Sequence, residues 1–299
     1  MLRYFTEFLK RHDVEYIESF DISSVSSIGI GGKALLAVIP NDKDKLIKTL
    51  DFITDNRIKY KIIGQMSNIL PTDALYDGAL ILTRKMRGYT VAENILTIDC
   101  GAKLSSVLSR IAKRNLGGME ELFGIPGSVG GMVSGNAGAY GKSISDFFIN
   151  AEVYSPQEKR VICFERDKME FSYRSSSIKN TDKVLLSANL SLEIIPWEKT
   201  REKMKEIITK RKSTQPYLEK SLGSVFLRCG VIPTSFMIDK IGLKGHSIGG
   251  AEISNKHAGF IVNKGNAKSE DVKALISYIK EKIYSSYGVI PKEEIEYLN

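Results

Sequence analysis

The sequence predicts an α/β protein, and three observations indicate this class. Residues 35–39 (LLAVI) and 60–63 (YKII) are short apolar runs typical of buried strands. Between them, residues 42–55 repeat apolar side chains at helical spacing, which completes one strand, helix, strand unit. A long strand of alternating character is predicted at 184–195. With 299 residues, of which 42% are hydrophobic, the chain is long enough for two or three domains with their own cores.

Two hairpins and one helix are predicted between these strands. After a strand at 79–83, the runs YTVA and ILTID form a hairpin that turns at Glu93-Asn94. Apolar spacing predicts a helix over 104–114, which leads into a glycine-rich stretch. The runs FINAEVY and VICF form a second hairpin around Pro156.

The last third of the chain has a different character. The pair Pro196-Trp197 marks a predicted boundary. A strongly charged helix follows from about Thr200, and its Lys and Arg alternate with Glu, which favours a solvated connector over a DNA-binding helix. The final helix is predicted from Ser269, as its N-cap, to Tyr284, with Gly288 as the stop signal.

The stretch 124–141, GIPGSVGGMVSGNAGAYG, holds seven glycines. Glycine costs backbone entropy, so a chain concentrates it where φ is positive or where something approaches the backbone closely. Amides with no side chain in front of them can cradle a pyrophosphate. A long glycine-rich surface loop is the alternative. Pro126, Asn136 and the small apolar residues Val133, Ala137 and Ala139 favour a binding loop.

Two better-known phosphate motifs are excluded. The run NAGAYGKS at 136–143 differs from a P-loop by one residue, since Asn136 stands where the pattern requires glycine, and no strongly apolar strand precedes it. The run GIGGKA at 29–34 fits GxGxxA, but KALLAVIP after it predicts a strand. Without a helix N-terminus the dinucleotide fingerprint loses its mechanism.

Composition indicates a cytoplasmic protein of ordinary globular type. The formal net charge is +8, but no block of consecutive basic residues occurs, which argues against nucleic acid as a partner and suits polyanionic small ligands. Cys100, Cys163 and Cys229 are far apart and show no CxxC spacing, so neither a disulfide framework nor a metal site is predicted. The amphipathic start MLRYFTEFLKRHD does not resemble a signal peptide, and no run reaches transmembrane length, so no membrane association is predicted.

The glycine-rich stretch is one of several motifs that occur in a particular order. These are GIGGKA (29–34), GQMSN (64–68), GIPGSVGG with NAGAYG (124–141), SYRSSS (172–177), QPYLEKSLGSVFLR (215–228), GLKGHSIGGAEISNKHAGFIVN (242–263) and PKEEIEYL (291–298). Over nearly the whole chain they resemble the UDP-N-acetylenolpyruvoylglucosamine reductases, FAD- and NADPH-dependent enzymes of bacterial cell-wall precursor synthesis. The short segment between Arg174 and the strand at 184–195 resembles the second, shorter type of this family.

The resemblance implies a two-subdomain FAD-binding fold of the vanillyl-alcohol-oxidase-like kind, with a third α/β domain for the substrate. The implied division is 1–66 for the first FAD subdomain, 67–197 for the second and 198–299 for the substrate domain. The last residues are candidates to return to the first subdomain. The three histidines, His12, His246 and His257, lie outside the flavin loops, so FAD is expected to be non-covalent.

The resemblance also implies ligand contacts. It assigns FAD to residues of three short segments: Gly64, Ser67, Asn68, Ile69, Gly124, Ile125, Pro126, Gly127, Ser128, Gly131, Asn136, Gly138 and Ala139. The pair Gln65-Met66 replaces a more usual glycine pair, which leaves the pyrophosphate contacts there open. Arg228 and Gln215 are implied contacts of the nucleotide sugar, and Lys264 is a weaker candidate for its phosphates.

Three residues carry the implied chemistry. Ser224 is the expected proton donor, although a serine in a tight turn is often only a cap. Arg174 is expected to bind the enolpyruvyl carboxylate, although it can also be an ordinary surface arginine beside serines. Glu294 is the third candidate, and Glu293 is its neighbour and rival.

The implied activity is NADPH-dependent reduction, through FAD, of UDP-N-acetylglucosamine enolpyruvate to UDP-N-acetylmuramate. The partners are then two small molecules, with no obligate protein partner. An FAD-dependent oxidase or dehydrogenase of a sugar or hydroxy acid is the alternative from the same fold. A basic nucleotide- or RNA-binding module is the alternative from another class, but the chain lacks a basic stripe interleaved with aromatics.

Overall fold

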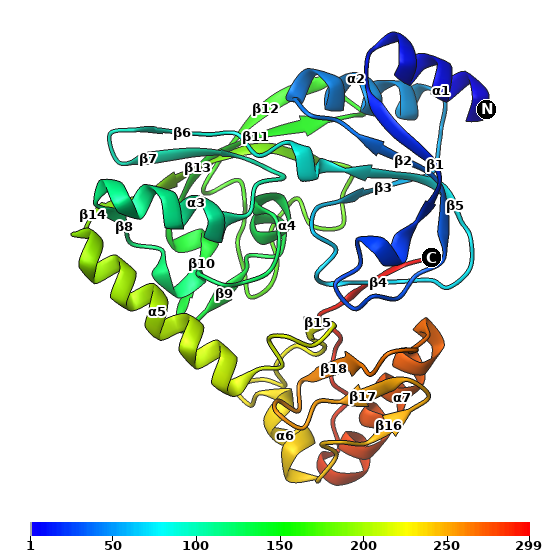
Figure 1. Cartoon of the computed structure of the whole chain (residues 1–299), viewed down its shortest axis with the longest axis vertical. Coiled ribbons are helices and arrows are strands. Elements are labelled where there is room, and N and C mark those ends of the chain that lie inside the picture. The colour runs from blue at the N-terminus through cyan, green and yellow to red at the C-terminus, as the bar shows by residue number, and fades with distance from the viewer. Residues whose placement is uncertain (1) are drawn as a thin grey trace. The chain divides into compact units, whose positions relative to one another are not determined.

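The computed structural model describes residues 2–299, which form two compact units (Figure 1). Neither unit is continuous in sequence. Unit 1 contains the residues up to Glu18, Leu36–Gln65 and Asp77–Thr209, and unit 2 contains Ser19–Leu35, Met66–Tyr76 and Lys210–Asn299. The three consecutive domains predicted from the resemblance stay a prediction, because contact density alone does not say which residues serve FAD and which serve the substrate.

The first sheet has four strands in the order β1 (Glu15–Asp21), β2 (Lys33–Ile39), β5 (Tyr76–Leu82) and β3 (Tyr60–Ile63). Strands β3 and β5 are parallel, and the predicted helix between β2 and β3 is α2 (Lys43–Asp55). Asp42 caps α2 by accepting the Lys45 N–H at 2.8 Å. Helix α1 (Leu2–Arg11) lies beside α2, where Phe5 stacks on Phe52 with ring centroids 5.0 Å apart (Figure 1). The predicted strand, helix, strand unit is confirmed.

The second sheet lies in unit 1 and has five strands. Their order is β12 (Arg160–Glu165), β11 (Phe148–Ser155), β13 (Val184–Ser191), β7 (Ile95–Asp99) and β6 (Tyr89–Ala92), and all neighbours are antiparallel. Both predicted hairpins, β6–β7 and β11–β12, are confirmed. Glu93 has a φ of 52° at the first turn, as a tight hairpin connection requires.

The long strand predicted at 184–195 is wrong in its second half. Strand β13 ends at Ser191 because its partner β7 begins at Ile95, the residue opposite. The Leu192 N–H then donates to the Asn94 carbonyl at 2.7 Å. The chain continues as β14 (Glu193–Ile194), which pairs instead with β8 (Leu116–Gly117).

The helices of unit 1 differ from the expectation mainly at their ends. Helix α3 (Leu104–Ile111) is followed by a 3-10 turn over Ala112–Arg114, so the predicted span is helical but not uniformly α. Helix α5 (Trp197–Thr214) begins directly at the predicted boundary, three residues before Thr200. It is continuous to Thr214, although the compact units divide after Thr209.

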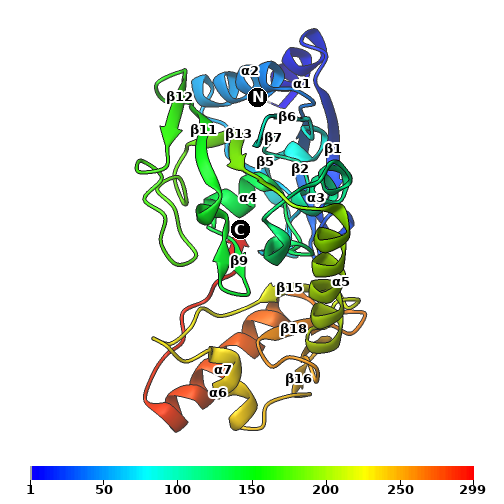
Figure 2. The same cartoon turned by 90° about the vertical axis from the view of Figure 1, so that its left-hand side faces the viewer.

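Unit 2 has a sheet in the order β15 (Ser221–Ser224), β18 (Phe260–Asn263), β17 (Ala251–Ile253) and β16 (Ser247–Ile248). Helices α6 (Thr234–Lys240) and α7 (Ser269–Tyr287) lie against it (Figure 2). One face of α7 is fully buried, by Val272, Leu275, Ile276, Ile279 and Ile283. No helix within residues 2–299 is long and apolar enough to cross a membrane.

The predicted ends of α7 are partly right. Gly288 ends the helix in a left-handed conformation, φ 69°, as predicted. The N-cap is Lys268 rather than Ser269, which is the first helical residue. The reason is tertiary: the Ser269 N–H donates to the Asp73 carboxylate at 2.7 Å, so the cap is supplied by another segment.

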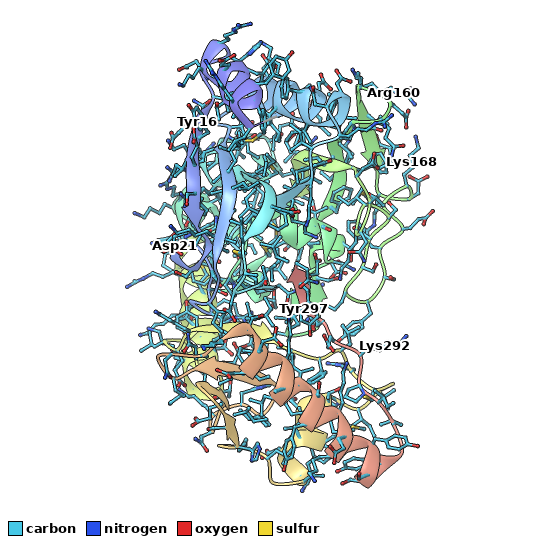
Figure 3. All side chains as sticks on the ribbon, turned by 90° about the vertical axis from the view of Figure 1, so that its right-hand side faces the viewer. Tyr16, Asp21, Arg160, Lys168, Lys292 and Tyr297 are labelled. Atoms are coloured by element: carbon cyan, nitrogen blue, oxygen red, sulfur yellow. The ribbon has the colours of Figure 1, made fainter. Side chains whose placement is uncertain are left out.

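The final residues form strand β19 (Glu296–Leu298), which is parallel to β4 (Ile69–Pro71). Lys292 and Tyr297 mark this terminal segment in Figure 3. The end of the chain therefore pairs with residues 69–71. The return of the last residues to the first FAD subdomain, implied by the resemblance, stays a prediction.

A buried hydrogen bond between α2 and β11 gives a test of this fold. Tyr154 is 1% exposed, and its hydroxyl donates to the Asp51 carboxylate. Burial, with Asp51 beside it, raises the pKa of Tyr154, so the hydroxyl keeps its proton at neutral pH. Tyr154→Phe should lower the free energy of unfolding by about 0.5–1.5 kcal/mol, because the half-buried Asp51 carboxylate loses its donor. Thermal unfolding of the flavin-loaded protein measures this.

Tyr4→Phe is the matched control, because Tyr4 is 58% exposed and contacts the same helix only through its ring. Equal melting temperatures for the two variants would contradict the assigned role of the Tyr154 hydroxyl.

Candidate active site

The glycine-rich stretch forms a loop and a short helix in unit 1. Helix α4 (Val129–Ser134) is capped by Ser128, whose Oγ accepts the Gly131 N–H at 3.4 Å. Val129 and Val133 are buried, whereas Gly131 is exposed, so the solvent side of this helix carries little side chain. Within residues 2–299 the N–H groups of Gly127 and Ser128 have no hydrogen-bond partner. Such amides fit an anionic group, as the sequence predicts for the FAD pyrophosphate.

A close approach of two backbones fixes this loop. Gly64 follows β3, and a Cβ atom at Gly64 would lie only 2.0 Å from Ser128 Oγ. On the other side, the Gly130 N–H donates to the Cys100 carbonyl at 2.7 Å, and the Val129 N–H donates to the Ala102 carbonyl at 2.9 Å. The segments that follow β3 and β7 therefore hold the start of α4 between them. Gly64 and Ser128, both predicted to contact FAD, lie against each other.

The NAGAYG run forms a hairpin, not a P-loop. Strand β9 (Gly138–Ala139) pairs with β10 (Lys142–Ser143), and no helix follows directly. The exclusion of a P-loop from the sequence is confirmed. The exclusion of the fingerprint at 29–34 is confirmed as well, because Lys33 begins strand β2.

Asn136, an expected contact of FAD, uses its side chain within the protein. Its Nδ2 donates to the Ser172 carbonyl at 2.9 Å, and its Oδ1 accepts the Ser145 N–H at 3.2 Å. The residue is 7% exposed and has a φ of 41°. Both polar groups of this side chain are therefore engaged with the chain's own backbone.

Arg174 lies beside the glycine-rich loop. Its guanidinium donates to the Gly138 carbonyl at 2.9 Å and lies over the Tyr173 ring, 5.3 Å from the centroid. Next to it, Ser176 Oγ donates to the Ser134 carbonyl at 2.8 Å. The structure thus brings a predicted catalytic residue to a predicted cofactor residue, Gly138.

Ser224 lies at the end of β15 in unit 2, where Gly223 has a φ of 77°. Only glycine takes this conformation readily, so Gly223 sets the direction in which the serine leaves the strand. Ser224 is half-buried, and its Oγ donates to the Phe226 carbonyl at 3.3 Å. Both sequence interpretations fit this geometry, since the hydroxyl forms a local bond and is still accessible.

Glu294 is held close to Ser224 by backbone pairing. The Glu294 N–H donates to the Val225 carbonyl at 2.8 Å. On the other side, Asn68 Nδ2 donates to the Glu294 carbonyl at 3.0 Å, and the Glu296 N–H donates to the Asn68 carbonyl at 2.9 Å. The terminal segment is therefore bonded both to the serine segment and to the GQMSN segment.

The carboxylate of Glu293, the alternative to Glu294, is engaged in structural contacts. One of its oxygens pairs with Lys280 Nζ on α7, and the other accepts the Tyr297 hydroxyl. Burial and this carboxylate raise the pKa of Tyr297, which keeps its proton on the donor. Glu293 thus ties the terminal segment to α7.

The other predicted residues are placed as follows. Met66 has a φ of 50°, the conformation usual for glycine, and precedes Ser67 and the strand residue Ile69. Arg228 is exposed, and the Gln215 N–H donates to the Arg211 carbonyl at 2.8 Å just after α5. Lys264 Nζ lies 3.5 Å from Glu219 and 3.7 Å from Glu252. Within residues 2–299 no group of three or more His, Cys, Asp or Glu side chains could hold a metal ion.

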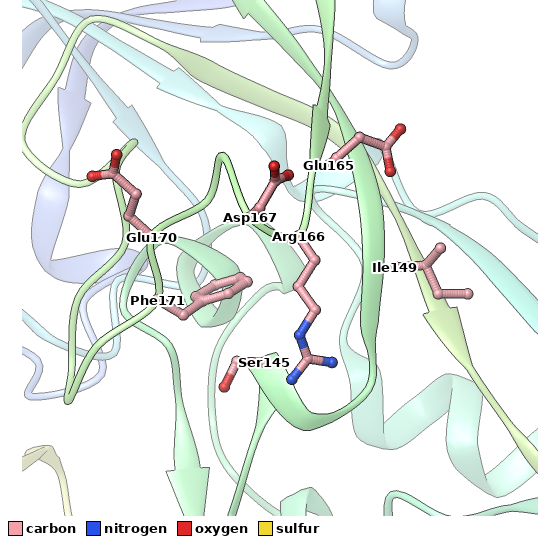
Figure 4. Close-up of a pocket in the computed structure, with 7 residues that line it drawn as sticks. All are labelled: Ser145, Ile149, Glu165, Arg166, Asp167, Glu170 and Phe171. Carbon is pink, nitrogen blue, oxygen red and sulfur yellow. The ribbon is translucent and has the colours of Figure 1, made fainter.

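A pocket in unit 1 was not predicted from the sequence. It has a volume of about 690 Å³ and is lined by Ser145, Ile149, Glu165, Arg166, Asp167, Glu170 and Phe171 (Figure 4). Its residues come from β11, from the end of β12 and from the turns beside them. None belongs to a recognisable motif, so no local signal could have found it.

Comparisons with known proteins agree along the chain. Residues 34–163 match a family described as an FAD binding domain, and residues 215–298 match the C-terminal domain of UDP-N-acetylenolpyruvoylglucosamine reductase. The reductase of this name from Caldicellulosiruptor bescii is 38% identical over 98% of this chain and 94% of its own length. The one from Thermosipho melanesiensis is 41% identical over 90% of this chain and 91% of its own.

A solved structure agrees with these relatives. The crystal structure of UDP-N-acetylenolpyruvylglucosamine reductase from Thermus caldophilus superposes with a TM-score of 0.81 at 26% identity, covering 96% of this chain and 99% of that one. The FAD-binding fold predicted from the resemblance is thereby confirmed.

The close approach at Gly64 gives a prediction about cofactor retention. In Gly64→Ala the new methyl group meets Ser128 Oγ, so the helix start must shift and the loop amides with it. We expect the purified variant to retain less than about a tenth of the flavin of the parent, as judged by visible absorbance at equal protein concentration, since displacement of preformed donors costs affinity steeply.

The double variant Gly64→Ala, Ser128→Gly is the control for this experiment. It removes both Ser128 atoms that the methyl group meets, at a cap cost of only about a few tenths of a kcal/mol. Flavin content should recover, and a double variant as empty as the single one would contradict the steric explanation.

Proposed function

This chain belongs to the UDP-N-acetylenolpyruvoylglucosamine reductase family, and we propose that Ser224, Arg174 and Glu294 carry out the chemistry of that family. It is an FAD-dependent oxidoreductase that reduces UDP-N-acetylglucosamine enolpyruvate to UDP-N-acetylmuramate with NADPH, in peptidoglycan precursor synthesis. The observation that supports the residue assignment best is the pairing of Glu294 with Val225, the residue after Ser224.

The described residues fit FAD. The loop amides of Gly127 and Ser128, with the bare backbone of Gly131 beside them, suit a pyrophosphate. We assign the remaining contacts to the other residues that the resemblance implies, with Asn136 set apart because its side chain is engaged within the chain. When bound, FAD passes a hydride from NADPH to the terminal CH2 carbon of the enolpyruvyl ether.

The adjacent carbon of the substrate then needs a proton. Its negative charge is shared with the carboxylate, and the resulting carbanion is basic enough to take a proton from an alcohol. We assign this proton to Ser224 Oγ. The existing bond from this hydroxyl to the Phe226 carbonyl is long, at 3.3 Å, so little is lost when the hydroxyl turns toward another acceptor.

Arg174 is assigned to the substrate carboxylate. Its charge is permanent, and its five N–H donors allow it to bind the Gly138 carbonyl and a carboxylate at the same time. Because the negative charge on that carboxylate grows during the reaction, the interaction is stronger in the transition state than in the ground state.

We assign Glu294 the task of assisting the proton donor, Ser224. A carboxylate near a growing anion helps only if it is protonated or if it orients a donor, and the backbone bond to Val225 keeps Glu294 next to the serine segment. Glu293 is a poor candidate, because Lys280 and Tyr297 already engage both of its oxygens.

The proposal extends to the nucleotide and the compartment. Arg228 and Gln215 are assigned to the nucleotide sugar, and exposed Arg228 offers a charge for its phosphates. We place the enzyme in the cytoplasm, where NADPH is available and where the free thiols of Cys100, Cys163 and Cys229 remain reduced. It needs no obligate protein partner in this proposal.

Ser224→Ala separates the two half-reactions. Reduction of the flavin by NADPH involves no proton donated to the enolpyruvyl carbon, so bleaching of the flavin in stopped flow should keep its rate. Reoxidation by the enolpyruvyl nucleotide should slow about 10²- to 10⁴-fold, because a positioned acid is lost. Arg174→Ala should also slow reoxidation. A Ser224 variant that is reoxidised as fast as the parent would show that another group donates the proton.

Glu294→Gln and Glu293→Gln form a matched pair of adjacent, nearly isosteric changes. Glu294→Gln should slow reoxidation about 10- to 100-fold with little change in melting temperature. Glu293→Gln should lower the melting temperature, because Lys280 loses its counter-charge, and should affect reoxidation less. If the kinetic loss follows Glu293 instead, the two roles must be exchanged.

A further inference from the structure

We propose that Asn136 is a positioning residue for Arg174, and that it acts through the turn that carries the arginine. The inference rests on the proposed role of Arg174 in binding the substrate carboxylate. It gives Asn136 a role different from the one that the resemblance implies, which was contact with FAD.

The first observation is that the turn around Arg174 is anchored at its base. Ser172 and Ser175 form an isolated antiparallel bridge, with N–H to carbonyl distances of 3.1 and 3.2 Å in the two directions. The Ser172 carbonyl also accepts Asn136 Nδ2 at 2.9 Å. Asn136 thus binds Ser172, one of the two residues that form the base of the turn.

The second observation is the conformation of Arg174 itself. Its φ is 58°, in the left-handed region that residues other than glycine rarely adopt. Such a conformation costs of order 1 kcal/mol or more and persists only when surrounding contacts determine it. The Arg174 carbonyl accepts Lys179 Nζ at 3.0 Å, and the bond from Asn136 fixes the start of the same turn.

The third observation is that Asn136 also helps to position the carbonyl group that accepts the Arg174 guanidinium. The Gly138 carbonyl, which binds Arg174, lies two residues after Asn136. Asn136 Oδ1 accepts the Ser145 N–H. This bond fixes the chain just after β10, the strand that pairs with Gly138 in β9. One side chain therefore ties both the turn of Arg174 and the hairpin that receives its guanidinium.

The close-up of the pocket shows how these segments are arranged. Ser145 and Phe171, the neighbours of the two segments that Asn136 joins, line the same pocket from different sides (Figure 4). Phe171 packs edge-on against Phe148, with centroids 5.0 Å apart, so the segment before Ser172 is also packed. The amide of Asn136 thus joins the segment of Ser145 to the segment of Ser172, and its bond to Ser172 adds to those of Arg174 with Gly138 and of Ser176 with Ser134.

Asn136→Asp tests the donor alone. Aspartate has the same shape, tolerates a positive φ and keeps the oxygen that accepts the Ser145 N–H. It replaces Nδ2 with an oxygen that faces the Ser172 carbonyl, so the turn is released. Asn136→Gly is the second variant, which removes both bonds without backbone strain at this position.

Asn189→Asp is the matched control. Asn189 is half-buried in the five-stranded sheet of the same unit, where its amide donates to Asn150 and its carbonyl accepts Thr97, both at 2.7 Å. It therefore makes two side-chain bonds, as Asn136 does, but within strands of the sheet and with none of the residues of the turn or the loop. If Asn136→Asp and Asn189→Asp slow reoxidation equally, the loss reflects general destabilisation and contradicts the positioning role.

We expect both Asn136 variants to retain FAD with a dissociation constant within about twofold of the parent, and to be reduced by NADPH at a near-normal rate. Reoxidation by the enolpyruvyl nucleotide should slow about 10- to 100-fold, and calorimetric affinity for UDP-N-acetylmuramate should fall, because misplacement of Arg174 weakens its hold on the carboxylate. The double variant with Arg174→Ala should be no slower than Arg174→Ala alone.

Other outcomes overturn the inference. Loss of FAD with normal reoxidation of the reconstituted protein would make Asn136 a cofactor ligand. If the Asn136 variants bind FAD normally and are reoxidised at the parent rate, Asn136 has no role in positioning Arg174. If Arg174→Ala itself is reoxidised normally, the proposed function of Arg174 fails and the inference fails with it. If Arg174→Ala is slow and the Asn136 variants are not, only the inference fails.

Discussion

The structure around the glycine-rich loop depends on the close approach of Gly64 to Ser128. A methyl group at Gly64 would lie 2.0 Å from Ser128 Oγ, far inside any allowed contact, so the end of β3 can meet the start of α4 only because residue 64 has no side chain. The same Ser128 caps α4. A short helix of this kind has little stability of its own, so its position comes from these contacts and from the bonds to Cys100 and Ala102. The loop amides stay where a ligand can use them because the backbone behind them is fixed on both sides.

A second constraint organises the residues of unit 2, where the end of the chain completes the surroundings of Ser224. Besides the pairing of β19 with β4, the terminal segment takes part in four backbone bonds, through Leu227, Glu294, Glu296 and Thr72, with lengths between 2.8 and 2.9 Å. Each contributes only about 0.5–1.5 kcal/mol, which by itself barely exceeds the cost of ordering a few terminal residues. The tie from Glu293 to α7 supplies a further anchor. Glu293 and Glu294 thus have complementary tasks in adjacent positions, one holding the segment and the other presented by it.

Local signals predicted the elements of this chain well, and tertiary contacts explain the errors. The hairpin at Glu93 was predictable because a turn and its flanking strands are encoded within a dozen residues. The break after Ser191 was not, because it depends on where a partner strand nearly 100 residues earlier begins. The cap of α7 was misplaced by one residue for a similar reason, since Asp73 satisfies the Ser269 N–H from a distant segment.

The site shows the same division between local and distant information. The seven glycines indicated a binding loop because they lie in one contiguous stretch, whereas the role expected of Ser224 in the GSVF run came from the family resemblance. The pocket beside Arg166 is made of residues from separate segments and left no pattern to read. Asn136 is intermediate: its presence in the loop was plain, but its partners are backbone atoms of Ser145 and Ser172, which no side-chain pattern reveals.

Backbone conformation gives a further reason to place Arg174 in the active machinery, provided that it is weighed with its contacts. Among residues 2–299, twelve residues other than glycine have a positive φ, and several of them, such as Asp13, lie at ordinary turns, so the conformation alone identifies nothing. At Arg174 the contacts are specific: its side chain binds Gly138, its carbonyl accepts Lys179, and the base of its turn accepts Asn136. A surface arginine would relax out of an unfavourable conformation at almost no cost, whereas here three separate interactions hold it. The fold therefore holds Arg174 in this conformation, and its guanidinium stays beside the glycine-rich stretch at Gly138.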